Sequence, residues 1–352
     1  MDDIARKLLD DLLATPGTSG YEEQVQQVVR DFLKPLADRI ETDVHGNVIA
    51  YKNPEAPHRI LIDAHCDQIG LVVSHVDDSG FLFFQTVGGW DPQQLVGQQV
   101  IVGSASEPIP GVISRKAIHL LEDSERNQVV KLPDLWIDIG ASSGAEARER
   151  VRVGDPVTLR PGYVPLMNRR IAGPAMDDRV GLWVALESFR RCADVRPPCC
   201  IVVVSAVQEE IGLRGAKTAA YAVDPHVGIA LEVTHATDCP SVDKRQQGDL
   251  RVGNGPVVFR GPNMNPKVFA ALERSATLTN TRMQVAACGR AAPNDSNSIQ
   301  VSRAGVATGL ISIPNRYMHS GVELVSLDDL EGAATMLSHF LTTTPADADW
   351  TP

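Results

Sequence analysis

Apolar residues recur at helical spacing near the start of the chain, from Ile4 to Leu13, and Ser19 and Glu22 then have the spacing of a capping box before a second helix. Further on, periodic segments alternate with short apolar runs. The expected helices cover residues 3–14, 25–33, 178–192, 213–222, 266–279 and 327–342. The expected strands cover residues 39–42, 47–51, 59–67, 200–207, 227–233, 282–287 and 307–313. This alternation predicts an α/β fold with a mixed sheet sandwiched by helices.

The pattern changes between residues 69 and 165. Strand-sized apolar runs such as GLVVSHV, FLFFQTVGG and LWIDIG follow one another there, separated by turn sequences such as DDSG. Runs of this length and spacing predict an inserted β-rich domain, a small barrel or sandwich. The α/β domain would then be discontinuous, formed by residues 1–68 and 166–352.

Composition and charge narrow the possible functions. The 352 residues carry a net charge of -11, which argues against nucleic-acid binding, since that depends on lysine and arginine. No apolar run reaches the ~20 residues of a membrane-spanning helix, and the acidic N-terminus does not resemble a signal peptide. The six cysteines form no CxxC pair, which disfavours a thiolate zinc site and indicates reduced thiols in the cytoplasm.

The strongest chemical signal is a set of acids and histidines at the expected ends of strands and helices. The run 201-IVVVSAVQEEIG-212 ends a buried strand in Glu209 and Glu210, two adjacent carboxylates. The other members of the set are His65, Asp67, Asp177, Asp178, Glu232 and His319. Ligands meet at the carboxyl ends of strands in α/β sheets, so these side chains are expected to converge. Their oxygen and nitrogen donors suit two divalent ions, zinc first, that share a carboxylate.

Adjacent residues of an extended chain point to opposite sides, so Glu209 and Glu210 are expected to do different work. One would ligate a metal ion, and the other would act as a general base. Each residue also has an ordinary structural explanation, such as helix-capping acids at Asp177 and Asp178 or a solvated loop at the two glutamates. The coincidence of the whole set favours the metal site. The same geometry argues against a thiol nucleophile formed by Cys66 and His65.

Nearly the whole chain resembles metallopeptidase family 42, the tetrahedral aminopeptidases, which also carry the labels glutamyl aminopeptidase, deblocking aminopeptidase and cellulase M endoglucanase. The motifs that carry the resemblance include 64-AHCDQIG-70, 86-TVGGWDPQQLVGQ-98, 173-GPAMDDRVG-181, 208-QEEIGLRGA-216, 232-EVTHATDCP-240 and 312-SIPNRYMHS-320. The resemblance implies that Asp177 bridges two metal ions, which His65, Glu210, Glu232 and His319 also ligate. It further implies that Glu209 is the general base and that Asp67 orients the imidazole of His65.

The resemblance also implies cleavage of short peptides at the N-terminus, with zinc, cobalt or manganese as the metal. The insert at residues 69–165 matches a PDZ-like dimerisation domain, so self-association into a tetrahedral dodecamer is expected. Two positions depart from the family pattern: Gln68, where an acid is usual, and Glu232, where Asp is usual. The alternatives are an endoglucanase, which would need two metal-free carboxylates, and a non-catalytic assembly protein, which would have lost a ligand or Glu209.

Overall fold

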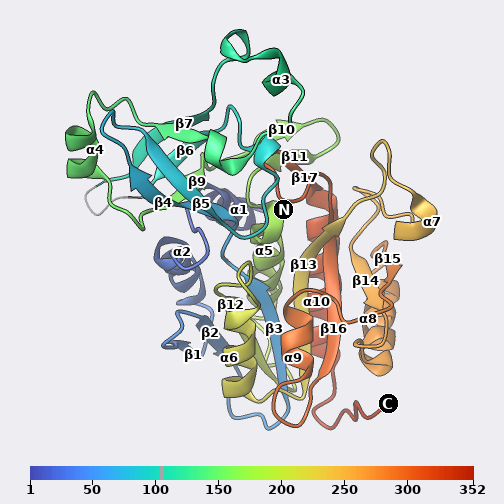
Figure 1. Ribbon diagram of the computed structural model, residues 1–352. Helices are drawn as coiled ribbons and strands as arrows, with labels where there is room; N and C mark the ends of the chain where they lie inside the picture. Colours follow the sequence, from blue (N-terminus) through green and yellow to red (C-terminus); the bar gives the residue numbers. More distant parts are fainter. Residues whose placement is uncertain (104–106) are drawn as a thin grey trace.

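The structure is a computed structural model in which residues 1–103 and 107–352 are described. Residues 104–106 of the expected insert lie outside that description. Eight strands form the central sheet, in the order β1-β2-β12-β3-β13-β16-β14-β15 (Figure 1). Their bounds are β1 Arg39–Thr42, β2 Val48–Lys52, β3 Arg59–His65, β12 Cys200–Ala206, β13 Val227–His235, β14 Val257–Arg260, β15 Gln284–Ala287 and β16 Ala307–Asn315.

The middle of this sheet is parallel, and the strands that flank it, β2 and β14, run antiparallel to it, although β14 and β15 are parallel to each other. β3 pairs in parallel with β12 and β13, and β13 pairs in parallel with β16. β2 and β14 run antiparallel to their inner neighbours. The predicted mixed sheet is therefore confirmed, and the four parallel strands end at one edge.

Helices cover both faces of the sheet because the side chains of each buried strand alternate between two cores. In β12, Ile201 and Val203 lie in one hydrophobic cluster, while Val202 and Val204 lie in the other. The first cluster packs against α1 (Asp3–Ala14), α2 (Glu23–Leu33), α5 (Met176–Arg191), α8 (Pro266–Leu278) and α10 (Leu327–Thr343). The second packs against α6 (Arg214–Val223) and α9 (Asp295–Gln300).

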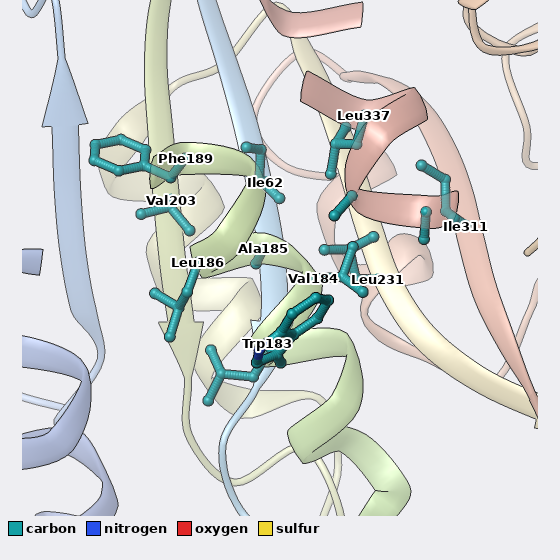
Figure 2. Close-up of a cluster of buried hydrophobic side chains, with 14 of the residues drawn as sticks. Ile62, Trp183, Val184, Ala185, Leu186, Phe189, Val203, Leu231, Ile311 and Leu337 are labelled. Atoms are coloured by element: carbon teal, nitrogen blue, oxygen red, sulfur yellow. The ribbon is translucent and has the colours of Figure 1, made fainter. Parts of the chain in front are cut away.

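The helix α5 is the centre of the larger core. Its Trp183 and Phe189 are buried beside Ile62 of β3 and Leu231 of β13 (Figure 2). The indole Nε1 of Trp183 donates a hydrogen bond of 2.7 Å to the carbonyl oxygen of Ala5, which ties α5 to α1. This packing fixes the position of the first turn of α5, which carries Asp177.

The predicted β-rich insert is a closed six-stranded barrel with strand order β4-β5-β8-β7-β6-β9. Its strands are β4 Gly70–Val76, β5 Leu82–Val87, β6 Gln99–Val102, β7 Ile109–Ser114, β8 Trp136–Asp138 and β9 Pro156–Leu159. Short elements interrupt or follow them: η1 Pro92–Gln94, η2 Ile118–Leu120, α3 Asp123–Arg126, η3 Leu132–Asp134 and α4 Gly144–Arg150. The barrel has its own hydrophobic cluster. The domain boundaries at residues 68/69 and 165/166 stay a prediction.

A three-stranded sheet follows the barrel, in the order β10 (Val164–Leu166), β11 (Arg170–Gly173) and β17 (Glu323–Ser326). The sequence pattern did not predict it, nor β14, α9 or the short α7 (Lys244–Gln247). These elements are brief, and their apolar residues follow no clear period.

Two local predictions were wrong. Ile4 is exposed, although helical spacing put it on the buried face of α1. Ser19 and Glu22 form no capping box, because Glu22 directly precedes the helix and its carboxylate accepts hydrogen bonds from the backbone N–H groups of Gly20 and Gln208 instead. In the part of the chain that the structure describes, no helix combines the length and apolar character needed to cross a membrane.

Candidate active site

The sheet topology brings the predicted residues together at one edge. His65 is the last residue of β3, and it lies in register with Ala206, the last residue of β12. Glu209 and Glu210 follow β12, and Glu232 lies in the last part of β13. Asp177 and Asp178 begin α5, and His319 lies between β16 and β17.

His65 is buried among three carboxylates. Its Nε2 lies 3.1 Å from Oδ1 of Asp177, 3.8 Å from Oε1 of Glu232 and 3.9 Å from Oε2 of Glu209. Its Nδ1 lies 3.1 Å from the backbone oxygen of Asp67. A carbonyl oxygen can only accept, so this contact places a proton on Nδ1. Nε2 donates to Oδ1 of Asp177 at 3.1 Å, and it is the nitrogen that a metal ion would bind in place of that proton.

His319 approaches the same centre from the other side. Its Nε2 lies 3.4 Å from Oδ2 of Asp177 and 3.5 Å from Oε2 of Glu210. Asp177 therefore presents one carboxylate oxygen to each histidine. Oε2 of Glu209 lies near His65 and Oε2 of Glu210 near His319, while a carboxylate oxygen of Glu210 also lies within 4.8 Å of potential ligand atoms of His65 and Asp177.

The donor atoms fit divalent cations. Two groups of potential ligands, His65–Asp177–Glu210 and His65–Asp178–Glu232, each have their donor atoms within 4.8 Å of one another. Ligands at ~2.1 Å from a tetrahedral ion are about 3.4 Å apart, which matches the distances around His319. Oε1 of Glu210 and Oδ2 of Asp178 are buried without a hydrogen-bond partner among the described residues. Buried acceptors of this kind are costly unless a proton or a cation satisfies them.

The electrostatics of the site follow from this crowding of acids. Burial raises the pKa of Glu209 to about 8, and burial together with the charge of Asp177 raises that of Glu210. Burial also raises the pKa of Glu232. For Asp177, burial acts in the same direction, but hydrogen bonds from His319 and His65 outweigh it and hold the pKa below its ordinary value. Bound divalent cations would offset the charge of all these groups.

The turn that carries the glutamates is held by Asp67. Oδ1 of Asp67 accepts from the backbone N–H of Glu209 at 3.0 Å, and Oδ2 accepts from that of Glu210 at 3.2 Å. The strand ends at Ala206, and Gln208 has a φ of 57°, so the two glutamates lie in a turn rather than in an extended chain. Their side chains diverge because of that turn, and Asp67 fixes it.

Asp178, a member of the predicted set to which no role was assigned, groups with His65 and Glu232. Two further buried acids were not part of that set. Asp63 of β3 and Asp295 of α9 are fully buried next to each other, and burial raises the pKa of both carboxyl groups, that of Asp63 to about 7. A carboxylate inside the apolar run RILIDAH was the available signal for Asp63. Nothing in the sequence pattern singled out Asp295.

The barrel also reaches the site. A Cβ atom at Gly89, in the loop after β5, would lie 3.2 Å from Nδ1 of His319. His319 and the backbone of Gly89 are hydrogen-bonded, so the loop braces the imidazole on the side opposite Asp177.

We expect Gly89→Ala to displace the His319 ring by a few tenths of an ångström and to lower kcat/KM several-fold, because that contact is tighter than ordinary van der Waals packing. Gly289→Ala is the matched control, since a Cβ at this exposed bend would meet open space and the φ of Gly289 lies outside the left-handed region. Steady-state kinetics on a peptide substrate compare the two variants. An equal loss in both would contradict the contact's role.

Comparison with known proteins identifies the family to which the chain belongs. Residues 46–336 match the family model described as M42 glutamyl aminopeptidase. The chain is 36% identical to the lysyl aminopeptidase of Pyrococcus furiosus over 340 residues, 95% of this chain and 96% of that one. It superimposes with a TM-score of 0.92 and 34% identity on the TET aminopeptidase of a marine-sediment Thaumarchaeota archaeon, covering 97% of each chain.

A further similar structure is the TET1 peptidase of Pyrococcus horikoshii, which can assemble into a tetrahedron or a large octahedral shell. The TM-score is 0.85 at 29% identity, over 97% of this chain and 100% of that one. The family match covers the strand-end residues described above, from His65 to His319. The chain therefore belongs to the M42 glutamyl aminopeptidase family and is a peptide hydrolase.

Proposed function

We propose that the chain is an aminopeptidase that removes N-terminal residues from short peptides with two divalent metal ions, zinc first and cobalt or manganese as alternatives. His65 and Glu232 ligate one ion, Glu210 and His319 ligate the other, and Asp177 bridges them. The observation that carries this proposal is the orientation of Asp177, whose two oxygens lie 3.1 Å and 3.4 Å from the two imidazoles.

When bound, the ions would polarise the peptide carbonyl and lower the pKa of a water. Glu209 takes the proton of that water and then gives it to the departing amine. Burial raises the pKa of Glu209 in the metal-free site, and two bound cations would lower it again and leave a carboxylate able to accept the proton. The carboxylate of Asp67 accepts a hydrogen bond from the backbone N–H of Glu209 and so holds Glu209 in place. The backbone oxygen of Asp67 keeps the proton of His65 on Nδ1, which leaves Nε2 for the metal ion. The other carboxylates are candidates to hold the free amine of the peptide.

The test is hydrolysis of a panel of aminoacyl p-nitroanilides by chelator-treated protein before and after addition of zinc, cobalt or manganese. We expect activity only with metal and none on the N-acetylated form of the best substrate. Chelator-resistant cleavage of a β-glucan would instead support the endoglucanase alternative, whose two carboxylates need no metal. A protein that binds two metal ions but hydrolyses no peptide would support the non-catalytic alternative. Because all six cysteines are free thiols, we place the protein in a reducing compartment, the cytoplasm.

Glu232 is expected to be a metal ligand despite being one methylene longer than the usual Asp. Its Oε2 accepts from the backbone N–H of Val233, which leaves Oε1 directed toward His65. We expect Glu232→Asp to remain active with an altered metal preference, and Glu232→Ala to bind one metal ion at least tenfold more weakly. Metal titration of the two variants by calorimetry measures this. Two ions bound as tightly in Glu232→Ala as in the parent would contradict the assignment.

Self-association into a tetrahedral dodecamer through residues 69–165 is part of the same proposal. Leu82, Phe84, Leu135 and Ile137 fill the barrel's own core. Apolar side chains remain exposed on the excursion between β7 and β8 that carries α3 (Figure 1): Ile118, Leu120 and Val129. An exposed apolar set of this kind is typical of an interface.

Replacing Ile118, Leu120 and Val129 with serine is expected to dissociate the assembly, because burial of these side chains would stabilise it by about 1.5–3 kcal/mol each per copy. Light scattering of parent and variant over a range of concentrations measures the mass. Tyr221→Ser with Leu278→Ser, exposed apolar positions on the α/β part, is the control. A parent that stays at the 38.0 kDa of one chain would refute assembly, and an intact shell in the triple variant would refute this surface.

A further inference from the structure

We propose that Glu323 is a positioning residue that holds the two halves of the metal site at a fixed separation. This inference rests on the proposed ligand set of Asp177 and His319. Glu323 begins β17, four residues after His319 but far along the chain from Asp177, and it is 2% exposed.

Each carboxylate oxygen of Glu323 accepts a backbone hydrogen bond from a different segment of the chain, and the backbone of Met176, next to Asp177, also interacts with this carboxylate. Oε2 accepts from the N–H of Asp177 at 3.0 Å, and Oε1 accepts from the N–H of His319 at 2.7 Å. Glu323 is in register with Gly173 of β11, just before the turn that leads into α5. One side chain therefore links the start of α5, which supplies the bridging carboxylate, to the loop that supplies the second histidine.

A carboxylate is the side chain that this geometry requires. A glutamine of the same shape has one accepting oxygen, and its NH₂ group would face the other backbone N–H as a second donor. The choice is costly, because burial and the nearby charge of Asp177 both disfavour an anion here. We infer that this carboxylate fixes the spacing of Asp177 and His319, and that this spacing outweighs the folding stability that a buried anion loses.

Glu323 and Asp67 form a matching pair of clamps. Asp67 accepts the N–H groups of Glu209 and Glu210 and lies at the end of β3 beside His65. Glu323 accepts the N–H groups of Asp177 and His319. Between them, the two carboxylates fix the backbone of four of the six residues proposed to ligate metal or to act as base.

The test compares Glu323→Gln with Asp329→Asn. Asp329 is also fully buried and also accepts two backbone N–H groups, those of Gly253 and Gly255, but it takes no part in the proposed site. Both variants lose a charged acceptor of the same kind. We expect Glu323→Gln to weaken binding of one zinc ion by about 10–100-fold, with activity recovered at excess zinc, while Asp329→Asn binds zinc as the parent does. Competition with a chromophoric chelator measures the affinity.

A second readout needs neither metal nor activity. In the metal-free parent, hydrogen exchange should be slow at the amides of Asp177 and His319, and Glu323→Gln should speed it there while Asp329→Asn should not. Parent amides that exchange as fast as an exposed loop would overturn the inference, even if Glu323→Gln does not fold. Equal weakening of zinc binding in the two variants would also overturn it, since loss of stability alone would then explain both. If Asp177→Ala binds zinc as tightly as the parent, the proposed ligand set is wrong. The hydrogen-exchange result still tests separately whether Glu323 holds the amides of Asp177 and His319.

Discussion

Glu209→Gln is expected to keep both metal ions and to lose about two to four powers of ten in kcat, the scale of a lost general base. Glutamine cannot accept the proton of the attacking water, yet it fills the same space. The backbone N–H of residue 209 would keep its bond to Asp67, so the turn should not move. Glu209 belongs to neither of the two groups of potential ligands, His65–Asp177–Glu210 and His65–Asp178–Glu232, which supports a role for it outside the ligand set.

Glu210→Gln is the matched control, because it makes the same chemical change one residue away. Oε2 of Glu210 lies 3.5 Å from Nε2 of His319, and its other oxygen has no hydrogen-bond partner among the described residues, as expected of a ligand. This variant should lose metal as well as activity. Elemental analysis after dialysis against metal-free buffer, combined with kinetics at saturating substrate, separates the two residues. Equal metal loss in both variants would contradict the division of labour.

Asp177→Ala is expected to release both metal ions and to lower kcat/KM by about 10³-fold, because it removes the one carboxylate that faces both histidines. The loss corresponds to about 4 kcal/mol of transition-state stabilisation, within the several kcal/mol that metal ions contribute to hydrolysis. Raising the zinc concentration should not restore the activity, in contrast to a variant that only loosens a ligand.

The control is Asp328→Asn, an exposed acid paired with Arg169 on the surface, where loss of the charge should cost well under 1 kcal/mol. Metal content and kinetics of both variants are measured together with their thermal midpoints. An Asp177→Ala protein that retains two ions would refute the bridging role and with it the two-metal proposal.

Local periodicity was enough to predict most of the α/β part. Apolar runs such as Ile201–Val207 can only be buried on both faces, so they place strands and helices within a few residues of their observed bounds. The turn-punctuated stretch after residue 69 likewise predicted a β-rich insert, and the structure shows a closed barrel there. The sequence pattern did not predict β10, β14 and β17, because strands of three or four residues are too short to show a period.

The types of the site residues were also visible, since acids and histidines at the ends of apolar runs are unusual without a ligand. The family resemblance, rather than the pattern, assigned a role to each of them. Those roles remain proposals. What the sequence could not show was which acids have oxygen atoms without partners, because that depends on everything packed around them.

The sequence by itself determined that His65, Glu209 and Glu232 lie at or near the ends of strands of one α/β fold, since strand, turn and helix preferences act over a few residues. Only the tertiary structure decided that Glu323 joins Asp177 to His319, and that Gly89 of the barrel touches His319. The contacts of Glu323 with Asp177 and of Gly89 with His319 join residues more than a hundred positions apart. They depend on how the sheet, the barrel and α5 pack together, and no local pattern of the chain encodes that packing.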